Sequence, residues 1–309
     1  MRKIEISIII PTYNRAELLF TAIKSAMAQT VRPDEIVVVD DGSSEDIRAV
    51  TSSFEADHLR YVRQERSGAP VARNRGLREA RGEYVLWLDS DDQLLPDCIK
   101  RHVANLAGRP DIDVSYGDLN ICDENLAFRQ VKAYEDWYGR PMELLGETIL
   151  DNKIPNPGTL VKKSCHTDLG GFDEEFTRAQ DYEFWTRLIP RAKVGHCGAV
   201  VCNWRWHSGN MSSDVVDFDT SFDVRLINRV LEKYSLRELY PRFDWESDPK
   251  ACEALCLLRL ANRFMILKDD LQALRYARKS LSACRTPQAM EIIRLATARL
   301  EAVSAGASA

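Results

Sequence analysis

The first hundred residues alternate between short apolar runs and amphipathic stretches. The run over residues 4–10 is continuous enough for a strand buried on both faces, and residues 35–39 form a second buried strand. Two further strands are expected over residues 59–62 and 84–88. Between them, apolar residues recur at helical spacing, as in Leu19, Ile23 and Met27. Pro70 marks the first turn of a helix over 70–80, and Pro96 begins another. This order predicts an α/β fold with a mostly parallel sheet and helices on both faces.

Farther along the chain the pattern changes twice. From about Ser115 to Pro157 it is irregular, after which we expect strands over 159–161 and 199–206 and a helix over 181–189. After Phe222 almost every position fits a helix, and a helical hairpin over 251–277 is broken at Lys268-Asp269-Asp270. We therefore predict an α/β domain over residues 1–214 and a C-terminal helical appendage over 215–309. The appendage resembles a tetratricopeptide hairpin, although the period of about 34 residues is not repeated.

Polar clusters follow three of the predicted strands. They are Pro11-Thr12-Tyr13-Asn14-Arg15, Asp40-Asp41-Gly42-Ser43 and Asp89-Ser90-Asp91-Asp92. Open α/β sheets bind their ligands at the carboxyl ends of the strands. The sequence therefore predicts a site at this edge of the sheet.

The acidic segment after the fourth strand carries the strongest signal. Asp89, Asp91 and Asp92 repel one another unless a cation or water relieves the charge. Carboxylate oxygens suit Mg²⁺ or Mn²⁺, which in turn bridge to a diphosphate. The alternative is a solvated turn that caps the helix beginning near Pro96.

Three further candidates lie on the predicted donor side, each with a plain structural alternative. Tyr13 offers a ring to a base or simply belongs to a helix start. Asp41 accepts a hydrogen bond from a base or ribose, or serves an Asp-Gly turn. Arg73 holds a phosphate or a carboxylate, or lies on a solvated basic helix face.

Two later segments add candidates for catalysis. Asp181 begins a helix, where it acts either as a general base toward an acceptor hydroxyl or as a helix cap. Trp185 faces a sugar or belongs to the core. His207 reaches a metal or diphosphate from a loop in which Gly209 is a hinge, or is a structural histidine.

Composition narrows the class of partner and the compartment. The net charge of −5 gives no reason to expect nucleic-acid binding, because no excess of Lys and Arg is available to neutralise phosphates. The eight cysteines include no Cys-x-x-Cys pair, which fits reduced thiols in the cytoplasm. The N-terminal apolar run contains Glu5 and ends at Pro11, so it is expected to be a strand and not a signal peptide. With no apolar run of about 18 residues, we expect only peripheral contact with the inner face of a membrane.

Taken in order, these segments resemble family 2 glycosyltransferases of the GT-A fold. The matching segments are Ser7–Arg15, Ile36–Ser43, Ala72–Asn74, Leu88–Asp92 and Gln180–Trp185, within residues 4–212. The resemblance implies an inverting, metal-dependent transfer from a nucleotide diphosphate sugar to a hydroxyl of a saccharide or lipid-linked saccharide. By family habit the nucleotide is UDP, with dTDP and GDP as alternatives, and the setting is bacterial surface-polysaccharide synthesis.

The resemblance also implies a role for each residue. The donor nucleotide would be bound by Pro11, Thr12, Tyr13, Arg15, Asp41, Arg73, Asp89 and Ser90. Asp91 and His207 would hold Mn²⁺ or Mg²⁺, and Asp181 would be the base. Gln180, which stands where many relatives have Glu, and Trp185 would lie on the acceptor side.

Two rival interpretations come from other classes of protein. A sugar-phosphate nucleotidyltransferase normally has a glycine-rich phosphate loop after its first strand, whereas Pro11–Arg15 contains no glycine. A noncatalytic scaffold would use the helical appendage to bind a protein partner or to form a dimer. It would have no need for several acidic groups at one sheet edge.

Overall fold

The protein is described by a computed structural model that covers residues 4–207 and 220–306. The chain divides into two compact units. The first contains Met1–Pro141 and Lys153–Phe218, and the second contains Met142–Asn152 and Asp219–Ala309. A short internal segment of the chain thus belongs with the C-terminal helices.

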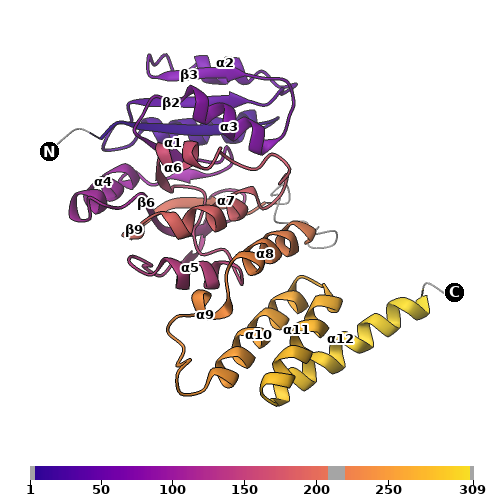
Figure 1. Ribbon diagram of the computed structural model, residues 1–309. Helices are drawn as coiled ribbons and strands as arrows, with labels where there is room; N and C mark the ends of the chain where they lie inside the picture. Colours follow the sequence, from indigo (N-terminus) through magenta and orange to yellow (C-terminus); the bar gives the residue numbers. More distant parts are fainter. Residues whose placement is uncertain (1–3, 208–219, 307–309) are drawn as a thin grey trace. The chain divides into compact units, whose positions relative to one another are not determined.

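The first unit is built on a mixed sheet of nine strands (Figure 1). Its strands are β1 (Ile6–Thr12), β2 (Glu35–Asp40), β3 (Leu59–Arg63), β4 (Tyr84–Trp87), β5 (Gln93–Leu94), β6 (Val114–Cys122), β7 (Phe128–Lys132), β8 (Leu160–Lys162) and β9 (Val194–Arg205). The order is β3-β2-β1-β4-β8-β6-β9-β5, with β7 paired to β6. Strands β3, β2, β1 and β4 are parallel, so their carboxyl ends meet at one edge.

Helices complete this unit. They are α1 (Ala16–Met27), α2 (Ile47–Ser52), α3 (Ala69–Glu79), α4 (Cys98–Gly108), α6 (Lys163–Asp168), α7 (Gln180–Leu188) and the short 3-10 helix η1 (Ile189–Arg191). The mostly parallel α/β fold expected from the sequence is confirmed.

Alternate residues of β1 show why the sheet needs helices on both faces. Ile8 and Ile10 are fully buried in the cluster that contains Leu19 and Ile23 of α1. Ile9 faces the other side, toward α3. A Cβ at Gly76 of α3 would lie 2.4 Å from Ile9 Cγ2, so glycine lets this helix approach the strand closely.

The main difference from the sequence expectation lies in the segment predicted to be irregular. It contains β6, β7 and α5 (Pro141–Thr148). Every residue of β7 is exposed, so the strand has no buried face and shows no apolar alternation. Strand β6 carries polar Asp118 and Asn120 where a buried strand would have apolar residues. Its pairing with β9 therefore comes from tertiary context and not from a local pattern.

The second unit is helical and includes α5. Its other helices are α8 (Ser221–Lys233), α9 (Leu236–Leu239), α10 (Pro249–Ile266), α11 (Asp270–Ala283) and α12 (Pro287–Gly306). The break predicted in the hairpin is confirmed: Lys268 has a φ of +57°, and Asp269 caps α11 by accepting a hydrogen bond from Gln272 N at 3.0 Å.

Helix α5 is tied to the C-terminal helices by specific contacts. Tyr240 Oη donates to the Gly146 carbonyl at 2.9 Å, and Arg259 pairs with Glu147 at 2.6 Å. A Cβ at Gly146 would lie 2.4 Å from the Leu239 carbonyl oxygen. The close approach therefore requires glycine at position 146.

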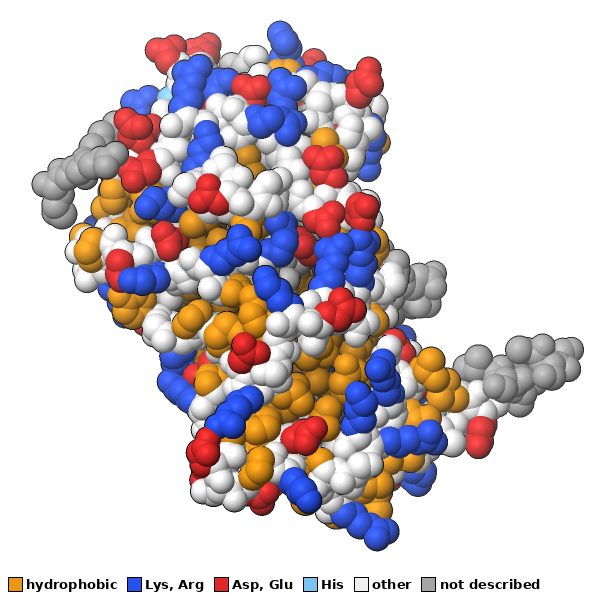
Figure 2. Space-filling model, viewed as in Figure 1, with side chains coloured by type: hydrophobic (Ala, Val, Ile, Leu, Met, Phe, Trp, Pro, Cys, Tyr) orange, Lys and Arg blue, Asp and Glu red, His pale blue; other side chains and the backbone are white. Residues whose placement is uncertain are grey.

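The surface and the cysteines add little to this arrangement. On the face drawn in Figure 2, basic and acidic side chains are interspersed. All eight cysteines are free. Within residues 4–207 and 220–306, no helix has the length and apolar character needed to cross a membrane.

Candidate active site

A cavity of about 550 Å³ opens at the carboxyl ends of β1, β2 and β4, beside the start of α3. The structure brings to it all eight residues expected to bind the donor nucleotide: Pro11, Thr12, Tyr13, Arg15, Asp41, Arg73, Asp89 and Ser90. Asp91, which was expected to hold the metal, lines the same cavity. It also adds residues that the sequence analysis did not select, among them Arg66, Gly68, Thr177 and Trp204. Residues far apart in the sequence thus line one cavity because parallel strands end together.

Arg73 and Asp89 form an ion pair in the wall of this cavity. Arg73 Nη2 donates to Asp89 Oδ1 at 2.6 Å, and the arginine is only 5% exposed. Its Nε and Nη1 have no hydrogen-bond partner among the described residues. A buried donor without a partner costs about 1–3 kcal/mol, so these two groups suit an anionic ligand such as a diphosphate.

Asn156 joins this pair, although no motif in the sequence singled it out. Its Nδ2 lies 3.5 Å from both carboxylate oxygens of Asp89. The residue precedes β8, which is antiparallel to β4, and the pairing brings it to the end of β4. A contact set by strand pairing over 67 residues leaves no local signal.

Asp91 is nearly buried and lies between two basic side chains. Its Oδ2 is 2.5 Å from Arg15 Nη1 and 3.1 Å from His207 Nε2. The structure thus places Asp91 and His207, the two residues expected to hold the metal, in contact, with Arg15 of the expected donor site beside them. Gly209, considered as a hinge, lies outside the described residues.

The Asp91–His207 pair has a carboxylate oxygen and an imidazole nitrogen that could serve as ligands of a divalent ion. Within the described parts of the chain, no cluster of three or more His, Cys, Asp or Glu side chains could hold a metal. Mg²⁺ is commonly held by one or two carboxylates together with substrate phosphates and water. The pair fits that pattern if a bound diphosphate provides the remaining oxygens.

Asp92 serves the scaffold of the cavity. Burial raises its pKa well above the ordinary value, and the neighbouring charges of Asp91 and Asp89 raise it further. Its Oδ1 accepts a hydrogen bond from Arg205 N at 2.9 Å. Asp92 therefore connects the acidic segment to the end of β9.

Asp41 lines the cavity while it shapes the loop before α3. Its Oδ1 accepts hydrogen bonds from Gln64 Nε2 at 2.8 Å and from Ser67 N at 2.9 Å. Its Oδ2 accepts one from Gly68 N at 2.8 Å. These bonds assign the Asp41 carboxylate a role in holding the loop before α3, which neither of the two expectations for this residue included.

Tyr13 is stacked with an arginine that the sequence analysis missed. The guanidinium carbon of Arg66 lies 3.1 Å from the centroid of the Tyr13 ring, and both residues line the cavity. Tyr13 is 39% exposed. A flat cationic and aromatic pair of this kind suits the base and phosphate of a nucleotide.

Asp181 lies in the first turn of α7, directly after Gln180, and is half-buried. Burial raises its pKa, the Arg73 guanidinium opposes that rise, and the Asp89 carboxylate adds to it. Asp181 is therefore within electrostatic reach of the Arg73–Asp89 pair, although it does not line the cavity itself.

The two residues assigned to the acceptor side are buried. Gln180 is 2% exposed, and its Oε1 has no partner among the described residues. Trp185 is completely buried, with its ring edge-on to Phe184. The expectation that Trp185 faces a sugar does not fit this burial, because the ring belongs to the core.

Asn74 fastens the loop that leads to α7. Its Oδ1 accepts a hydrogen bond from Phe172 N at 2.8 Å, and its Nδ2 donates to the Phe172 carbonyl at 2.9 Å. Gly171 has a φ of +81°, and a Cβ there would lie 2.4 Å from Asn74 Oδ1. Arg187 donates to the Leu169 and Gly171 carbonyls from the other side. The position of Asp181 thus depends on contacts with α3.

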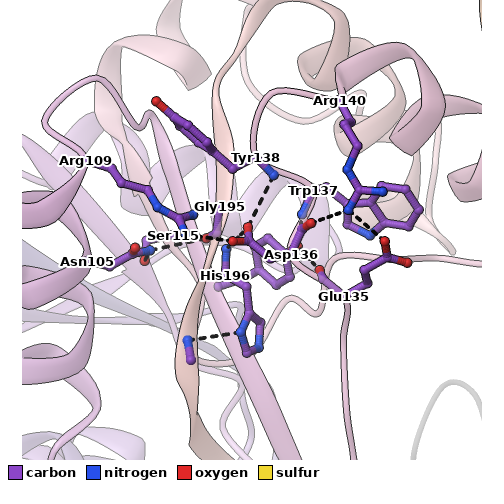
Figure 3. Close-up of polar contacts among 12 residues, drawn as sticks. Asn105, Arg109, Ser115, Glu135, Asp136, Trp137, Tyr138, Arg140, Gly195 and His196 are labelled. Carbon is purple, nitrogen blue, oxygen red and sulfur yellow. Dashed lines mark hydrogen bonds and ion pairs between the residues drawn. The ribbon is translucent and has the colours of Figure 1, made fainter.

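A second polar network lies away from the cavity, around Asp136 (Figure 3). Asp136 Oδ1 accepts hydrogen bonds from His196 N at 3.0 Å and Tyr138 N at 3.2 Å. Its Oδ2 pairs with Arg109 at 2.8 Å, and this ion pair lowers the Asp136 pKa against the opposing effect of burial. The network fixes the segment before α5 to β9 and the end of α4.

Comparison with known proteins agrees with the geometry. Residues 7–159 match the model of glycosyl transferase family 2. An uncharacterized glycosyltransferase of Rickettsia felis is 30% identical over 224 residues, which are 71% of this chain and 37% of that protein. One of Rickettsia typhi is 28% identical over 236 residues, 76% of this chain and 74% of that protein. Chondroitin synthase of Escherichia coli is 25% identical over 235 residues, 75% and 33% of the two chains.

A solved structure shares the fold. S. aureus TarS 1-349 in complex with UDP-GlcNAc superimposes with a TM-score of 0.56 at 18% identity, covering 91% of this chain and 89% of that one. The chain spans 37% of the length of the Rickettsia felis and Rickettsia conorii relatives. Through residues 7–159 the chain belongs to the family 2 glycosyltransferases, and its α/β unit has the GT-A fold.

Proposed function

We propose that the enzyme transfers a sugar, with inversion, from a UDP-sugar to a hydroxyl of a saccharide or a lipid-linked saccharide. The observation that carries this proposal is the cavity in which Arg73, Asp89 and Asp91 meet. Asp181 lies within electrostatic reach of that group. Cationic and acidic groups at one sheet edge, with a separate carboxyl group nearby, are what displacement of a diphosphate needs.

The donor would occupy the cavity with its nucleotide toward Thr12, Tyr13 and Arg66. The Nε and Nη1 of Arg73, which have no partner in the described part of the chain, would donate to diphosphate oxygens. The structural neighbour TarS was crystallised with UDP and with UDP-GlcNAc, which supports UDP over other nucleotides.

Asp91 and His207 would hold the divalent ion. Bound Mn²⁺ or Mg²⁺ stabilises the negative charge that develops on a departing diphosphate. Arg15 places a further positive charge beside Asp91, so the chain itself contributes to the same stabilisation.

Asp181 would act as the general base. The acceptor oxygen bonds to the anomeric carbon on the face opposite the diphosphate, and its proton passes to the Asp181 carboxylate. The bond between the anomeric carbon and the phosphate oxygen breaks, and its electron pair leaves with the diphosphate. Because burial raises the Asp181 pKa, the carboxylate is a stronger base than an exposed one.

The biological setting is proposed from the relatives. Chondroitin synthase makes a polysaccharide by its name, and it aligns over 75% of this chain. We propose synthesis of a bacterial surface polysaccharide in the cytoplasm, with peripheral contact at the inner membrane face when the acceptor is lipid-linked. A nucleotidyltransferase would instead release pyrophosphate from a nucleoside triphosphate.

Calorimetry with a panel of UDP-, dTDP- and GDP-sugars, with and without Mn²⁺, tests the proposal. We expect a UDP-sugar to bind and Mn²⁺ to strengthen its binding. Asp91→Asn should lose the Mn²⁺-dependent increment, whereas the exposed control Asp57→Asn should keep it.

Each part of the proposal has its own contrary outcome. An equal Mn²⁺ effect in Asp91→Asn would remove the metal assignment. Binding of UTP and a sugar phosphate without any nucleotide-sugar turnover would favour the nucleotidyltransferase. If no nucleotide binds, the noncatalytic scaffold is the interpretation that remains.

A further inference from the structure

Two tryptophans at the end of β9 have no role in the scheme above. Trp204 lines the cavity, and Trp206, two residues later, is 43% exposed. Their rings meet edge to face, with centroids 5.4 Å apart at 79°. Trp206 thus presents an indole ring to solvent beside the reaction site, although burying a large aromatic side chain is strongly favourable.

The backbone that carries these rings is fixed to the acidic segment. Arg205, which lies between them, is buried and donates its backbone N–H to Asp92 Oδ1 at 2.9 Å. Its Nε donates to the Asp91 carbonyl at 2.7 Å. Trp206 N donates to the Cys122 carbonyl at 2.8 Å. The backbone that carries the exposed ring is therefore held by hydrogen bonds from Arg205 to Asp91 and Asp92.

The chemistry of an indole ring selects the kind of ligand. The ring is uncharged and has one N–H donor, so it offers little to a phosphate. A pyranose has an apolar C–H face that stacks on an aromatic ring while its hydroxyls stay in water. His207, next in sequence, contacts Asp91, so a sugar on Trp206 lies close to the reacting groups.

The position of Trp206 selects between the two sugars of the reaction. In the proposed function the donor occupies the cavity, which Trp204 lines and Trp206 does not. Because the exposed ring of Trp206 lies outside the donor cavity, it is available to the other substrate, the acceptor.

We propose that Trp206, supported by Trp204, is the stacking platform for a pyranose ring of the saccharide acceptor. This inference rests on the proposed glycosyl transfer to a saccharide. It concerns acceptor recognition alone and assigns Trp206 no part in donor binding.

The test compares nucleotide release from the bound donor in water and in the presence of acceptors. The probes are methyl glycosides of glucose, galactose, mannose, N-acetylglucosamine and N-acetylgalactosamine. Trp206→Ala should raise the acceptor KM by about two- to tenfold, the range that the loss of one aromatic contact gives. The donor KM and the rate of release in water should not change. Trp206→Phe, which keeps a stacking face, should restore most of the acceptor affinity.

Phe20→Ala is the matched control. Phe20 is 45% exposed and packs on Phe54 at 5.0 Å, which resembles the exposure and ring pairing of Trp206, but it does not line the cavity. This variant should leave both KM values unchanged.

Three results would overturn the inference. The first is an acceptor KM of Trp206→Ala equal to that of the wild type. The second is a rise in the donor KM of this variant instead. The third is a wild-type enzyme that hydrolyses its donor but releases nucleotide no faster with any of the glycosides. These results leave glycosyl transfer standing. If the wild-type enzyme neither binds nor hydrolyses a nucleotide sugar, the proposed function fails and the platform fails with it.

Discussion

At the scale of single residues, Asp181 combines burial with the influence of two opposite charges. Burial raises its pKa and Asp89 adds to the rise, whereas Arg73 limits it. A carboxyl group whose pKa is raised in the folded state holds its proton more tightly there than in the unfolded chain. Its effect on stability is therefore unfavourable above the folded pKa, and its basicity is increased. The burial that makes Asp181 a stronger base thus also lowers the free energy of unfolding when the carboxyl group is ionised.

Asp181→Asn tests both consequences. Transfer should fall by at least about a hundredfold because the proton has no acceptor, while donor affinity measured by calorimetry stays the same. In the wild type, kcat/KM should fall on the acid side at a higher pH than an exposed Asp, with a pKa of about 3.9, would give. The free energy of unfolding should fall as pH rises from the unfolded toward the folded pKa, and the variant should lack that loss. A variant that turns over normally or loses donor affinity would contradict the base assignment.

The residues that could be predicted from sequence share one property. Asp89 and Asp91 directly follow an apolar run, so the local sequence predicts both the strand and the position of the two acids at its end. Arg66 and Asn156 reach the same site through a loop and a strand pairing, and nothing in their neighbours reveals it. For Trp185 the sequence offered a sugar-binding ring or a core ring, and its complete burial agrees with the core alternative.

At the scale of elements, α3 connects the Arg73–Asp89 pair to the loop before α7. Arg73 and Asn74 are adjacent on α3: one pairs with Asp89, and the other binds the loop before Asp181. Arg73 thus contacts the donor cavity, and Asn74 holds the loop that leads to the proposed base. A single helix therefore helps to set the distance between the donor cavity and Asp181.

Asn74→Ala should weaken that coupling. The loss leaves the Phe172 N–H and carbonyl without their partners and should lower the free energy of unfolding by about 1–3 kcal/mol. We expect kcat to fall more than donor affinity, because the base moves while the cavity remains. Chemical denaturation, calorimetry and a turnover assay measure these three quantities. Asn125→Ala, at an exposed turn, is the control, and an equal effect there would contradict the assignment.

The elements themselves were predictable where their periodicity reflects burial. Strands β1, β2 and β4 are buried along their length and read as apolar runs. Strand β7 is exposed throughout and β6 carries polar residues, so neither shows a period. Their formation depends on backbone pairing with a neighbour that the local sequence does not contain.

At the scale of the whole molecule, the helical unit includes a segment from inside the α/β chain. A boundary near residue 214 follows the change in sequence texture, but residues 142–152 lie beyond what such a change can show. Tyr240, Leu239 and Arg259 contact α5. Composition cannot reveal this, because α5 is an ordinary short amphipathic helix.

Truncation after residue 218 should therefore harm the part that remains. It removes the contacts that Tyr240 and Arg259 make with Gly146 and Glu147 of α5. We expect a lower melting temperature and aggregation on heating, followed by calorimetry and light scattering. Tyr240→Phe in the full chain should cost only about 1 kcal/mol, since it removes one hydrogen bond. A truncated protein as stable as the full chain would show that α5 does not depend on these contacts.

The assignment of residues 142–152 to the helical unit has a consequence for exchange between relatives. The polypeptide passes between its two units at three points, after residues 141, 152 and 218. A chimera joined at one of these points would combine α5 from one parent with C-terminal helices from the other, so the contacts of Leu239, Tyr240 and Arg259 with α5 would not be matched. Helical regions of this kind should be transplanted only when both of their segments travel together, and Gly146 is the position at which a mismatched graft would first clash.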